Sequence, residues 1–269
     1  MTRTESRPER TSAFDHLAES YDDSFTQSAV GRALRNLVWS RLDECFRTGQ
    51  RVLELGCGTG EDALWLAEKG VEVVATDASA KMIDRARAKQ GMRAGPAKVS
   101  FHCVAMENLS ALRELPRFDA VLSNFGAVNC VTDIRALSSE LAGLLAPDAR
   151  LIWVVMGRHV PWEWLWYLAK AQPHKALRRY QENGTLWRGM TISYPTPRQL
   201  ARMLAPHFQS TRVSPLGWAL PPSYASGWLD RSPRILAALT RLESITQGSS
   251  MLASAADHYM FEARLRTAH

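Results

Sequence analysis

Between positions 51 and 89, short aliphatic runs take turns with segments whose apolar residues recur at helical spacing. This order predicts strands separated by helices. The runs "RVLELG" and "VEVVATD" are rich in aliphatic residues, as in strands buried within a parallel sheet. Between them, "EDALWLAEKG" places apolar residues at helical spacing and stops at Gly70, which suits a left-handed helix end. Ser79 predicts the N-cap of a second helix with Met82, Ile83 and Ala86 on one face. This order predicts a parallel sheet with right-handed crossovers.

The first turn from strand to helix contains Gly56, Gly58 and Gly60, and the second strand ends at Asp77. In a parallel sheet both features lie at the carboxyl edge, where ligands bind. Glycines let the backbone turn sharply and let a ligand touch the main chain. An acid at the tip of the second strand can accept hydrogen bonds from two ribose hydroxyls. Together these residues predict a nucleoside site.

The glycine spacing favours one kind of nucleoside. The pattern is GxGxG and not the GxGxxG of dinucleotide sites, and Glu54 stands two residues before Gly56. A carboxylate at that place repels a pyrophosphate and suits a cationic ligand. S-adenosylmethionine (SAM) carries a sulfonium and an amino group and needs no phosphate cradle.

Two of these stretches also resemble a known family. "LELGCGTG" followed by "VVATDAS" is similar to the first two motifs of the class I SAM-dependent methyltransferases, most of all to members that act on quinone, lipid or natural-product acceptors. The resemblance implies an α/β fold: a Rossmann-like, seven-stranded, mostly parallel sheet with an antiparallel strand seven. It also implies SAM as the cofactor and S-adenosyl-L-homocysteine as the product.

The resemblance implies a set of cofactor-binding residues. Upstream, "AFDHLAESYDDSF" is similar to a segment that precedes the core in small-molecule members, where it forms a helical lid. Downstream, "FDAVLSNFGAVNCV" looks like strand four and the loop that follows it. The implied residues are Phe14, Tyr21, Glu54, Gly56, Cys57, Gly58, Gly60, Asp77, Ala78, Met82, Ala105, Met106, Glu107, Asn124 and Phe125.

One position departs from the family pattern. The segment "VAMENL" has Ala105 where the family often has an aspartate before the residue that contacts adenine. The adenine amino group then needs another partner, either Glu107 or a backbone carbonyl. The backbone N–H of Met106 remains available to the ring.

The rest of the chain completes the expected sheet and adds two insertions. "HFQSTRVSPLG" predicts strand six, "TPRQLARMLAP" the helix before it, and "DHYMFEARLR" strand seven. The predicted divisions are a flexible tail at 1–12, the SAM-binding core with its lid helices at 13–157, a cap insertion at 158–190, core again at 191–217, a second cap at 218–256, and the last core strand at 257–269.

Aromatic residues concentrate in the two insertions. A mostly helical cap with an aromatic-lined acceptor pocket is one interpretation, with Trp162, Trp166, Trp187 and Trp228 as pocket residues. Packing of these tryptophans within the cap, without substrate contact, is an equal alternative. A helix lying weakly on a membrane surface is a third, since Trp and Lys favour interfaces.

Candidate catalytic residues follow from the chemistry. Methyl transfer releases a neutral thioether, so holding the reactants together supplies most of the catalysis. A hydroxyl acceptor also needs a base, most often histidine. His159 follows strand five at the ligand edge, and His258 begins strand seven; Tyr194 and Asp133 are weaker candidates. For each histidine, a structural role without catalysis stays open.

Composition limits the remaining options. The net charge of +6 is spread along the chain, apart from "HKALRRYQ", so no nucleic-acid partner is expected. Four scattered cysteines indicate a reducing, cytoplasmic location, and no metal-ligand pattern occurs. The opening ten residues lack an apolar signal region. The expected partner is a small-molecule acceptor, and both a monomer and a homodimer fit.

Two other functions stay open at this stage. A nicotinamide-dependent oxidoreductase could use a variant glycine loop, and a non-catalytic protein could keep the methyltransferase fold as a binding module. Binding of SAM, of NAD or of neither would separate the three.

Overall fold

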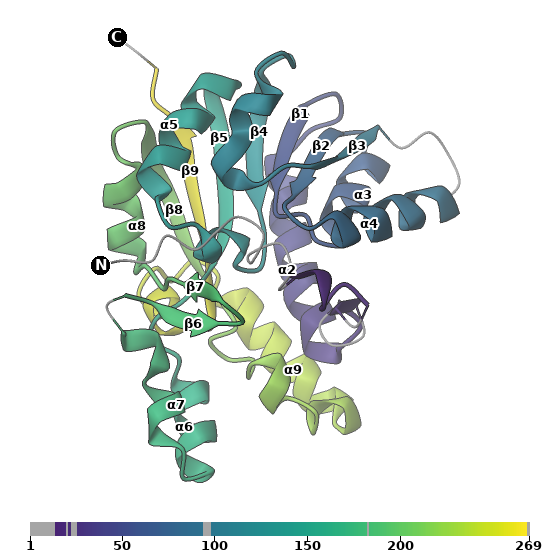
Figure 1. Cartoon of the computed structure of the whole chain (residues 1–269). Coiled ribbons are helices and arrows are strands. Elements are labelled where there is room, and N and C mark those ends of the chain that lie inside the picture. Colours follow the sequence, from purple (N-terminus) through teal and green to yellow (C-terminus); the bar gives the residue numbers. More distant parts are fainter. Residues whose placement is uncertain (1–13, 20, 23–25, 94–97, 182, 268–269) are drawn as a thin grey trace.

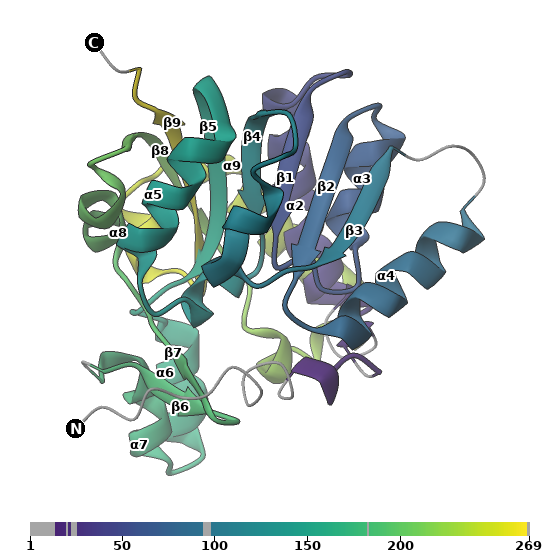
Figure 2. The same cartoon turned by 45° about the horizontal axis from the view of Figure 1, so that its top comes forward.

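In a computed structural model of the chain, the structure describes residues 14–19, 21–22, 26–93, 98–181 and 183–267. The tail expected at 1–12 lies outside these residues. A seven-stranded sheet forms the centre (Figures 1 and 2). Its strands, in spatial order, are β3 (Val99–Cys103), β2 (Glu72–Asp77), β1 (Arg51–Leu55), β4 (Phe118–Ser123), β5 (Leu145–Met156), β9 (His258–Leu265) and β8 (Phe208–Leu216).

The strand directions confirm the expected fold class. Neighbours from β3 to β5 pair in parallel, whereas β9 is antiparallel to both β5 and β8. Because β9 runs opposite to β5 and β8, it begins at the end of the sheet where those two strands finish. His258, the first residue of β9, therefore lies opposite Met156 and Leu216, the last residues of β5 and β8.

Helices cover both faces of the sheet (Figure 2). One face packs against α2 (Ala29–Cys45), α3 (Glu61–Glu68) and α4 (Ala80–Met92). The other packs against the 3₁₀ helix η2 (Met106–Leu112), α5 (Ile134–Leu144) and α8 (Pro197–Leu204). Alternate residues of one strand therefore enter different cores: Met260 of β9 packs on the α2 side, and Tyr259 and Phe261 pack on the α5 side.

Local signals in the sequence act as expected at the helix ends. Ser79 caps α4, because its side chain accepts a hydrogen bond from the backbone N of Met82 at 3.2 Å. Gly70, just beyond α3, has a φ of +79°, which a residue with a side chain rarely adopts. Both signals fix where the chain turns back toward the next strand.

The two insertions leave the sheet at one end (Figure 1). The first contains α6 (Pro161–Ala169), α7 (Pro173–Ala176) and a ribbon of β6 (Thr185–Trp187) and β7 (Met190–Ile192). The second contains α9 (Pro233–Ile245). The expected division at 190/191 falls inside β7, because Thr185 pairs with Ile192 and so extends the ribbon to that residue. In the described part of the chain, no helix has the length and apolar character to cross a membrane.

Candidate cofactor and active site

The loop after β1 depends on left-handed glycines. Gly56, Gly58 and Gly60 have φ values of +65°, +52° and +81°. A Cβ at Gly56 would come within 2.4 Å of Ala127 Cβ, and one at Gly60 within 2.9 Å of Ala86 Cβ. A Cβ at Gly58 would instead meet a ring atom of Tyr21 at 3.9 Å, an ordinary contact. Gly56 and Gly60 thus permit close packing, while Gly58 leaves open backbone beneath an aromatic ring.

Asp77 holds this loop from the tip of β2. One carboxylate oxygen accepts a hydrogen bond from the backbone N of Gly58 and the other from that of Ser79, each at 2.9 Å. Burial raises the pKa of Asp77, and the two N–H donors oppose that shift. Each carboxylate oxygen can accept more than one hydrogen bond, so capacity for two ribose hydroxyls remains.

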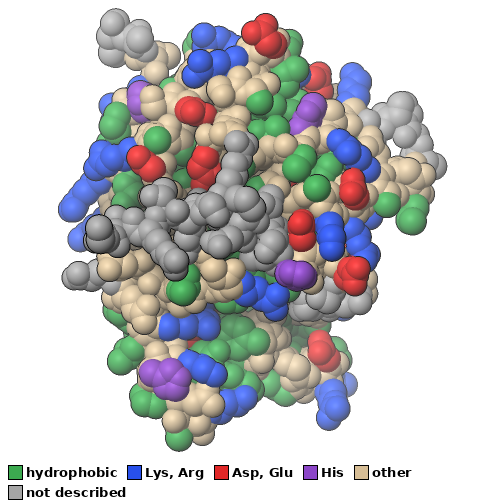
Figure 3. All heavy atoms as spheres, in the orientation of Figure 1, with side chains coloured by type: hydrophobic (Ala, Val, Ile, Leu, Met, Phe, Trp, Pro, Cys, Tyr) green, Lys and Arg blue, Asp and Glu red, His purple; other side chains and the backbone are tan. Residues whose placement is uncertain are grey.

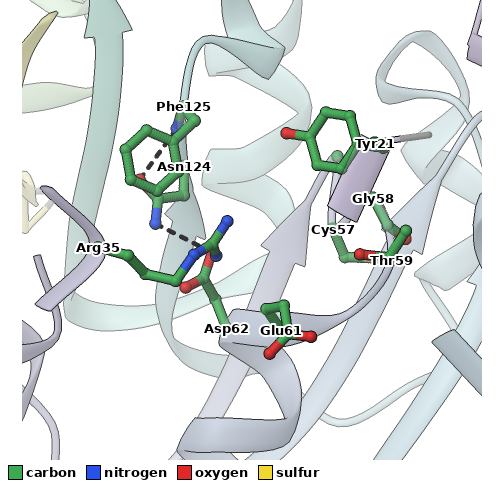
Figure 4. Close-up of a pocket in the computed structure, with 10 residues that line it drawn as sticks. Tyr21, Arg35, Cys57, Gly58, Thr59, Glu61, Asp62, Asn124 and Phe125 are labelled. Atoms are coloured by element: carbon green, nitrogen blue, oxygen red, sulfur yellow. Dashed lines mark hydrogen bonds and ion pairs between the residues drawn. The ribbon is translucent and has the colours of Figure 1, made fainter. Parts of the chain in front are cut away.

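A pocket opens beside the loop (Figure 4). The rings of Tyr21 and Phe125 face it from two different segments of the chain. The remaining lining residues are Arg35, Gly56, Cys57, Gly58, Thr59, Glu61, Asp62 and Asn124. Of the residues implied by the family resemblance, the structure therefore brings together Tyr21, Gly56, Cys57, Gly58, Asn124 and Phe125.

The pocket also contains a buried ion pair that the sequence did not indicate. Arg35 Nη1 of α2 lies 2.6 Å from Asp62 Oδ2 of α3, and both residues are buried. Asn124 and the indole of Trp39 donate hydrogen bonds to the same carboxylate at 2.9 and 2.7 Å. The Arg35 guanidinium lies 4.9 Å from the centre of the Phe125 ring. The pair presents both a cation and an anion to the pocket.

Glu54 is the last but one residue of β1, two residues before Gly56, and is not part of the pocket lining. Its side chain is buried, and its Oε2 has no hydrogen-bond partner among the described residues. Burial raises the pKa of Glu54 well above its ordinary value, and the nearby Asp62 raises it further. A buried carboxylate without a donor is costly unless a ligand supplies one.

An ionic cluster attaches the N-terminal segment to the loop. Thr59 donates a hydrogen bond to Asp22 at 2.7 Å, and Lys89 of α4 lies 2.8 Å from Asp22 and 2.6 Å from Glu61. This contact places Tyr21, the neighbour of Asp22, over Gly58. No pattern in the sequence indicated that Asp22 holds this N-terminal segment.

The chain is similar in sequence to known methyltransferases. Residues 52–148 match the family model of a methyltransferase domain. The tRNA 5-carboxymethoxyuridine methyltransferase of Escherichia coli (strain K12) is 30% identical, over 54% of this chain and 57% of its own length. The demethylmenaquinone methyltransferase of Clavibacter sepedonicus is 32% identical, over 54% and 58%. The chain thus matches over little more than half the length of these curated relatives.

The methyltransferase-domain match and these relatives support the expected class I SAM-dependent methyltransferase. The match contains the glycine loop, Asp77 and Asn124 and reaches to the start of β5. A solved structure of the CcbJ methyltransferase from Streptomyces caelestis extends the likeness in fold to nearly the whole chain. It has a TM-score of 0.62 and 15% identity, and covers 96% of this chain and 99% of that one.

The site of this methyltransferase fits SAM chemically. The ribose needs an acceptor, a role that Asp77 could fill, and the adenosine needs an approach to open backbone, which Gly58 would allow. The amino-acid end of SAM has an ammonium and a carboxylate. Glu54, with its unpartnered oxygen, suits the ammonium, and Arg35 suits the carboxylate.

The other implied cofactor residues lie around this centre. Met106, at the start of η2, reaches the glycine loop, because its Cε lies 2.9 Å from where a Cβ of Gly56 would stand. Ala78 follows β2 and Ala105 precedes η2, both partly exposed, while Glu107 is exposed. Met82 is a buried residue of α4, and the Phe14 ring packs against Trp187, 5.9 Å between centroids.

The three catalytic candidates occupy different surroundings. His258 Nδ1 lies 3.2 Å from Asp257 Oδ2, and its ring packs edge-on against Phe125 of the pocket at 5.9 Å. His159 forms a 2.6 Å hydrogen bond with the Tyr180 hydroxyl, and burial together with Arg158 lowers its pKa. Tyr194 is buried beneath Arg179, and burial raises its pKa. His258 is thus the candidate that contacts the pocket lining.

The four cap tryptophans are not core residues. Trp187 and Trp228 are 37% and 45% exposed, and Trp162 and Trp166 are partly exposed. Trp162 donates a hydrogen bond to the Trp218 carbonyl, which links the two insertions. Trp166 lies under Lys170 of its own helix, with Nζ 4.1 Å from the ring centre.

Proposed function

We propose that this methyltransferase transfers a methyl group from SAM to a small apolar or aromatic acceptor, at oxygen or nitrogen. The observation that carries the proposal is the contact between His258 and Phe125. It joins a histidine–aspartate pair to the pocket formed by the glycine loop. When bound, SAM supplies a methyl group on a positively charged sulfur, and S-adenosyl-L-homocysteine leaves as a neutral thioether.

In this proposal His258 accepts the proton of an acceptor hydroxyl. The Asp257 carboxylate lies 3.2 Å from Nδ1 but outside hydrogen-bond geometry; in the proposal it pairs with Nδ1 when the ring takes up a proton, which leaves Nε2 for the acceptor. Burial alone would raise the pKa of Asp257, but His258 and Arg179 outweigh burial and hold the pKa below its usual range. Asp257 is therefore an anion that stabilises the imidazolium formed by proton transfer.

Several features favour a small apolar acceptor. Trp187 of the first insertion meets Phe14 of the N-terminal segment, and both insertions lie at the end of the sheet that carries His258 (Figure 1). A closed aromatic surface near the methyl group would exclude water and hold the reactants. One relative is named for demethylmenaquinone, which suits such a surface, and another for a tRNA base, which is the competing class.

The matched relatives favour methyl transfer over the alternative of a nicotinamide oxidoreductase. A non-catalytic binding protein is distinguished from an enzyme only by turnover. We also propose a cytoplasmic location, based on the scattered cysteines of the sequence, and either a monomer or a homodimer as the working form.

The test is transfer of radiolabelled methyl from SAM to a panel of phenols, catechols, naphthohydroquinones and unmodified tRNA. The proposal expects label in one small-molecule class. It also expects His258→Gln to lower kcat about 100-fold or more while SAM affinity changes less than about twofold. His207→Gln, at the opposite edge of the sheet, is the matched control.

The pH profile separates a base from a structural residue. The wild-type rate should rise with pH through one ionisation that His258→Gln removes. Label on tRNA alone would overturn the small-molecule proposal. Full activity of His258→Gln would remove His258 from the mechanism.

A further inference from the structure

In helix α6 of the first insertion, the acidic side chain is buried and leucine side chains are exposed. Its sequence, "PWEWLWYLA", is apolar except for Glu163, yet Glu163 is its buried residue at 1% exposure. On the opposite side Leu165 is 64% and Leu168 57% exposed, and Leu177 beyond α7 is 60% exposed. The hydrophobic effect alone would orient this helix the other way.

An ionic network fixes the orientation of α6. Arg179 Nη2 lies 2.7 Å from Glu163 Oε2, Arg178 Nε lies 2.9 Å from Oε1, and the Tyr224 hydroxyl donates to Oε2 at 2.8 Å. Arg179 also pairs with Asp257 at 2.7 Å, which ties the network to the core. Rotation of α6 to bury its leucines would expose this carboxylate and take from Arg178 and the buried Arg179 the partner that they share. The apolar face is therefore held outward.

Helix α9 of the second insertion repeats the arrangement. Its buried residue is Glu243, which accepts hydrogen bonds from the backbone N of Gly217 at 2.8 Å and of Ala219 at 2.9 Å. Ile235 and Ile245 of the same helix are 48% and 72% exposed. Both helices belong to the insertions at one end of the molecule (Figure 1), and each has exposed aliphatic side chains.

Among the described residues of the first insertion, the exposed charges are positive. From 158 to 190 the sequence has Lys or Arg at 158, 170, 175, 178, 179 and 188, and acids only at 163 and 182. Lys170, Lys175 and Arg188 are exposed, whereas Glu163 is buried. Figure 3 shows hydrophobic, basic and histidine side chains over the lobe formed by α6 and α7, with few acidic ones.

We propose that the face formed by Leu165, Leu168, Leu177, Lys170 and Lys175 docks on an anionic lipid surface. Apolar side chains enter the boundary between headgroups and acyl chains, and nearby cations pair with anionic headgroups. The Lys170 ammonium over the Trp166 ring suits this boundary, where an aromatic ring and a charged tip lie together. The basic surface favours lipid over a second copy of the chain, since two such faces would repel each other.

Docking would place the two insertions beside acceptors dissolved in the lipid. This consequence rests on the proposed function, whereas docking itself does not. The direct test is co-sedimentation of the full chain with phosphatidylcholine vesicles, with and without phosphatidylglycerol. Wild type should bind the anionic vesicles at least about tenfold more tightly. The Lys170→Glu/Lys175→Glu variant should lose at least about tenfold, since each cation near such a surface contributes roughly fivefold.

A second variant tests the contribution of the exposed leucines to vesicle binding. Leu165→Ser/Leu168→Ser should weaken binding at least about tenfold, and added salt should not abolish the difference. The matched controls on α4, Lys81→Glu/Arg85→Glu and Met92→Ser, should bind vesicles as wild type does. All three substituted residues are exposed and remote from the insertions.

Three results would overturn the proposal: no preference of wild type for anionic vesicles, equal losses in the α4 controls, or a dimer that Leu165→Ser/Leu168→Ser converts to a monomer. The last result would assign the face to a second copy. SAM affinity measured on the same variants should equal that of wild type. Absence of SAM binding in wild type would instead refute the proposed function and leave the docking result to stand separately.

Discussion

Asp77 provides the sharpest test of the cofactor site. In Asp77→Ala the backbone N–H groups of Gly58 and Ser79 lose acceptors that lie at 2.9 Å. A hydrogen bond to a charged group contributes about 1.5–3 kcal/mol, and burial of the carboxylate offsets part of that. We therefore expect the free energy of unfolding to fall by roughly 2 kcal/mol. SAM affinity should fall at least about tenfold, because the ribose hydroxyls lose the same acceptor.

Measuring two ligands on both wild type and Asp77→Ala separates a lost contact with the ribose from a distorted glycine loop. Calorimetric titration compares S-adenosylhomocysteine with its 2′-deoxy analogue on both proteins. In wild type, loss of the hydroxyl should cost at least about tenfold; in Asp77→Ala it should cost less than about threefold. Asp84→Ala, an exposed carboxylate of α4, is the control and should behave as wild type. Equal penalties in wild type and Asp77→Ala would refute the assignment.

Three further predictions address the loop, the cap and the buried acid. Gly58→Val should abolish SAM binding with a loss of only about 1–2 kcal/mol of stability, whereas Gly49→Val, strained at φ +86° but remote, should keep binding. Trp187→Ala should raise the acceptor KM at least about tenfold without the roughly 3–5 kcal/mol stability loss expected for the fully buried Trp153→Ala. Glu54→Gln should stabilise the ligand-free protein by about 1–3 kcal/mol near neutral pH and weaken SAM binding. The pKa of Glu54 is raised in the folded protein, so its ionisation destabilises the fold increasingly as pH rises above 4.5, the ordinary value. The stability advantage of Glu54→Gln should therefore vanish as pH falls toward 4.5. A stability difference that does not change with pH would contradict this.

The parts of the fold that could be predicted are determined by residues close together in the sequence. The glycine loop, Asp77 and the Ser79 cap lie within one strand–helix–strand–helix unit, where local spacing determines which edge each residue reaches. The start of β9 was predictable too, and its antiparallel direction brings His258 to the same edge.

The remaining parts depend on contacts between distant segments. Arg35 and Asp62 are 27 residues apart, and their pairing follows from how α2 packs beside α3. The inward face of α6 had no signal in its own residues, since the helix is apolar nearly all round. Arg179 and Tyr224, 16 and 61 residues beyond Glu163, determine it.

The most direct test of the central claim is a crystal structure of the full chain with S-adenosylhomocysteine. The account predicts both ribose hydroxyls within about 3.2 Å of the Asp77 carboxylate, adenosine against the backbone at Gly58, and sulfur on the side of the pocket that faces His258. Ribose hydroxyls bound by other residues, or a ligand away from the glycine loop, would contradict it.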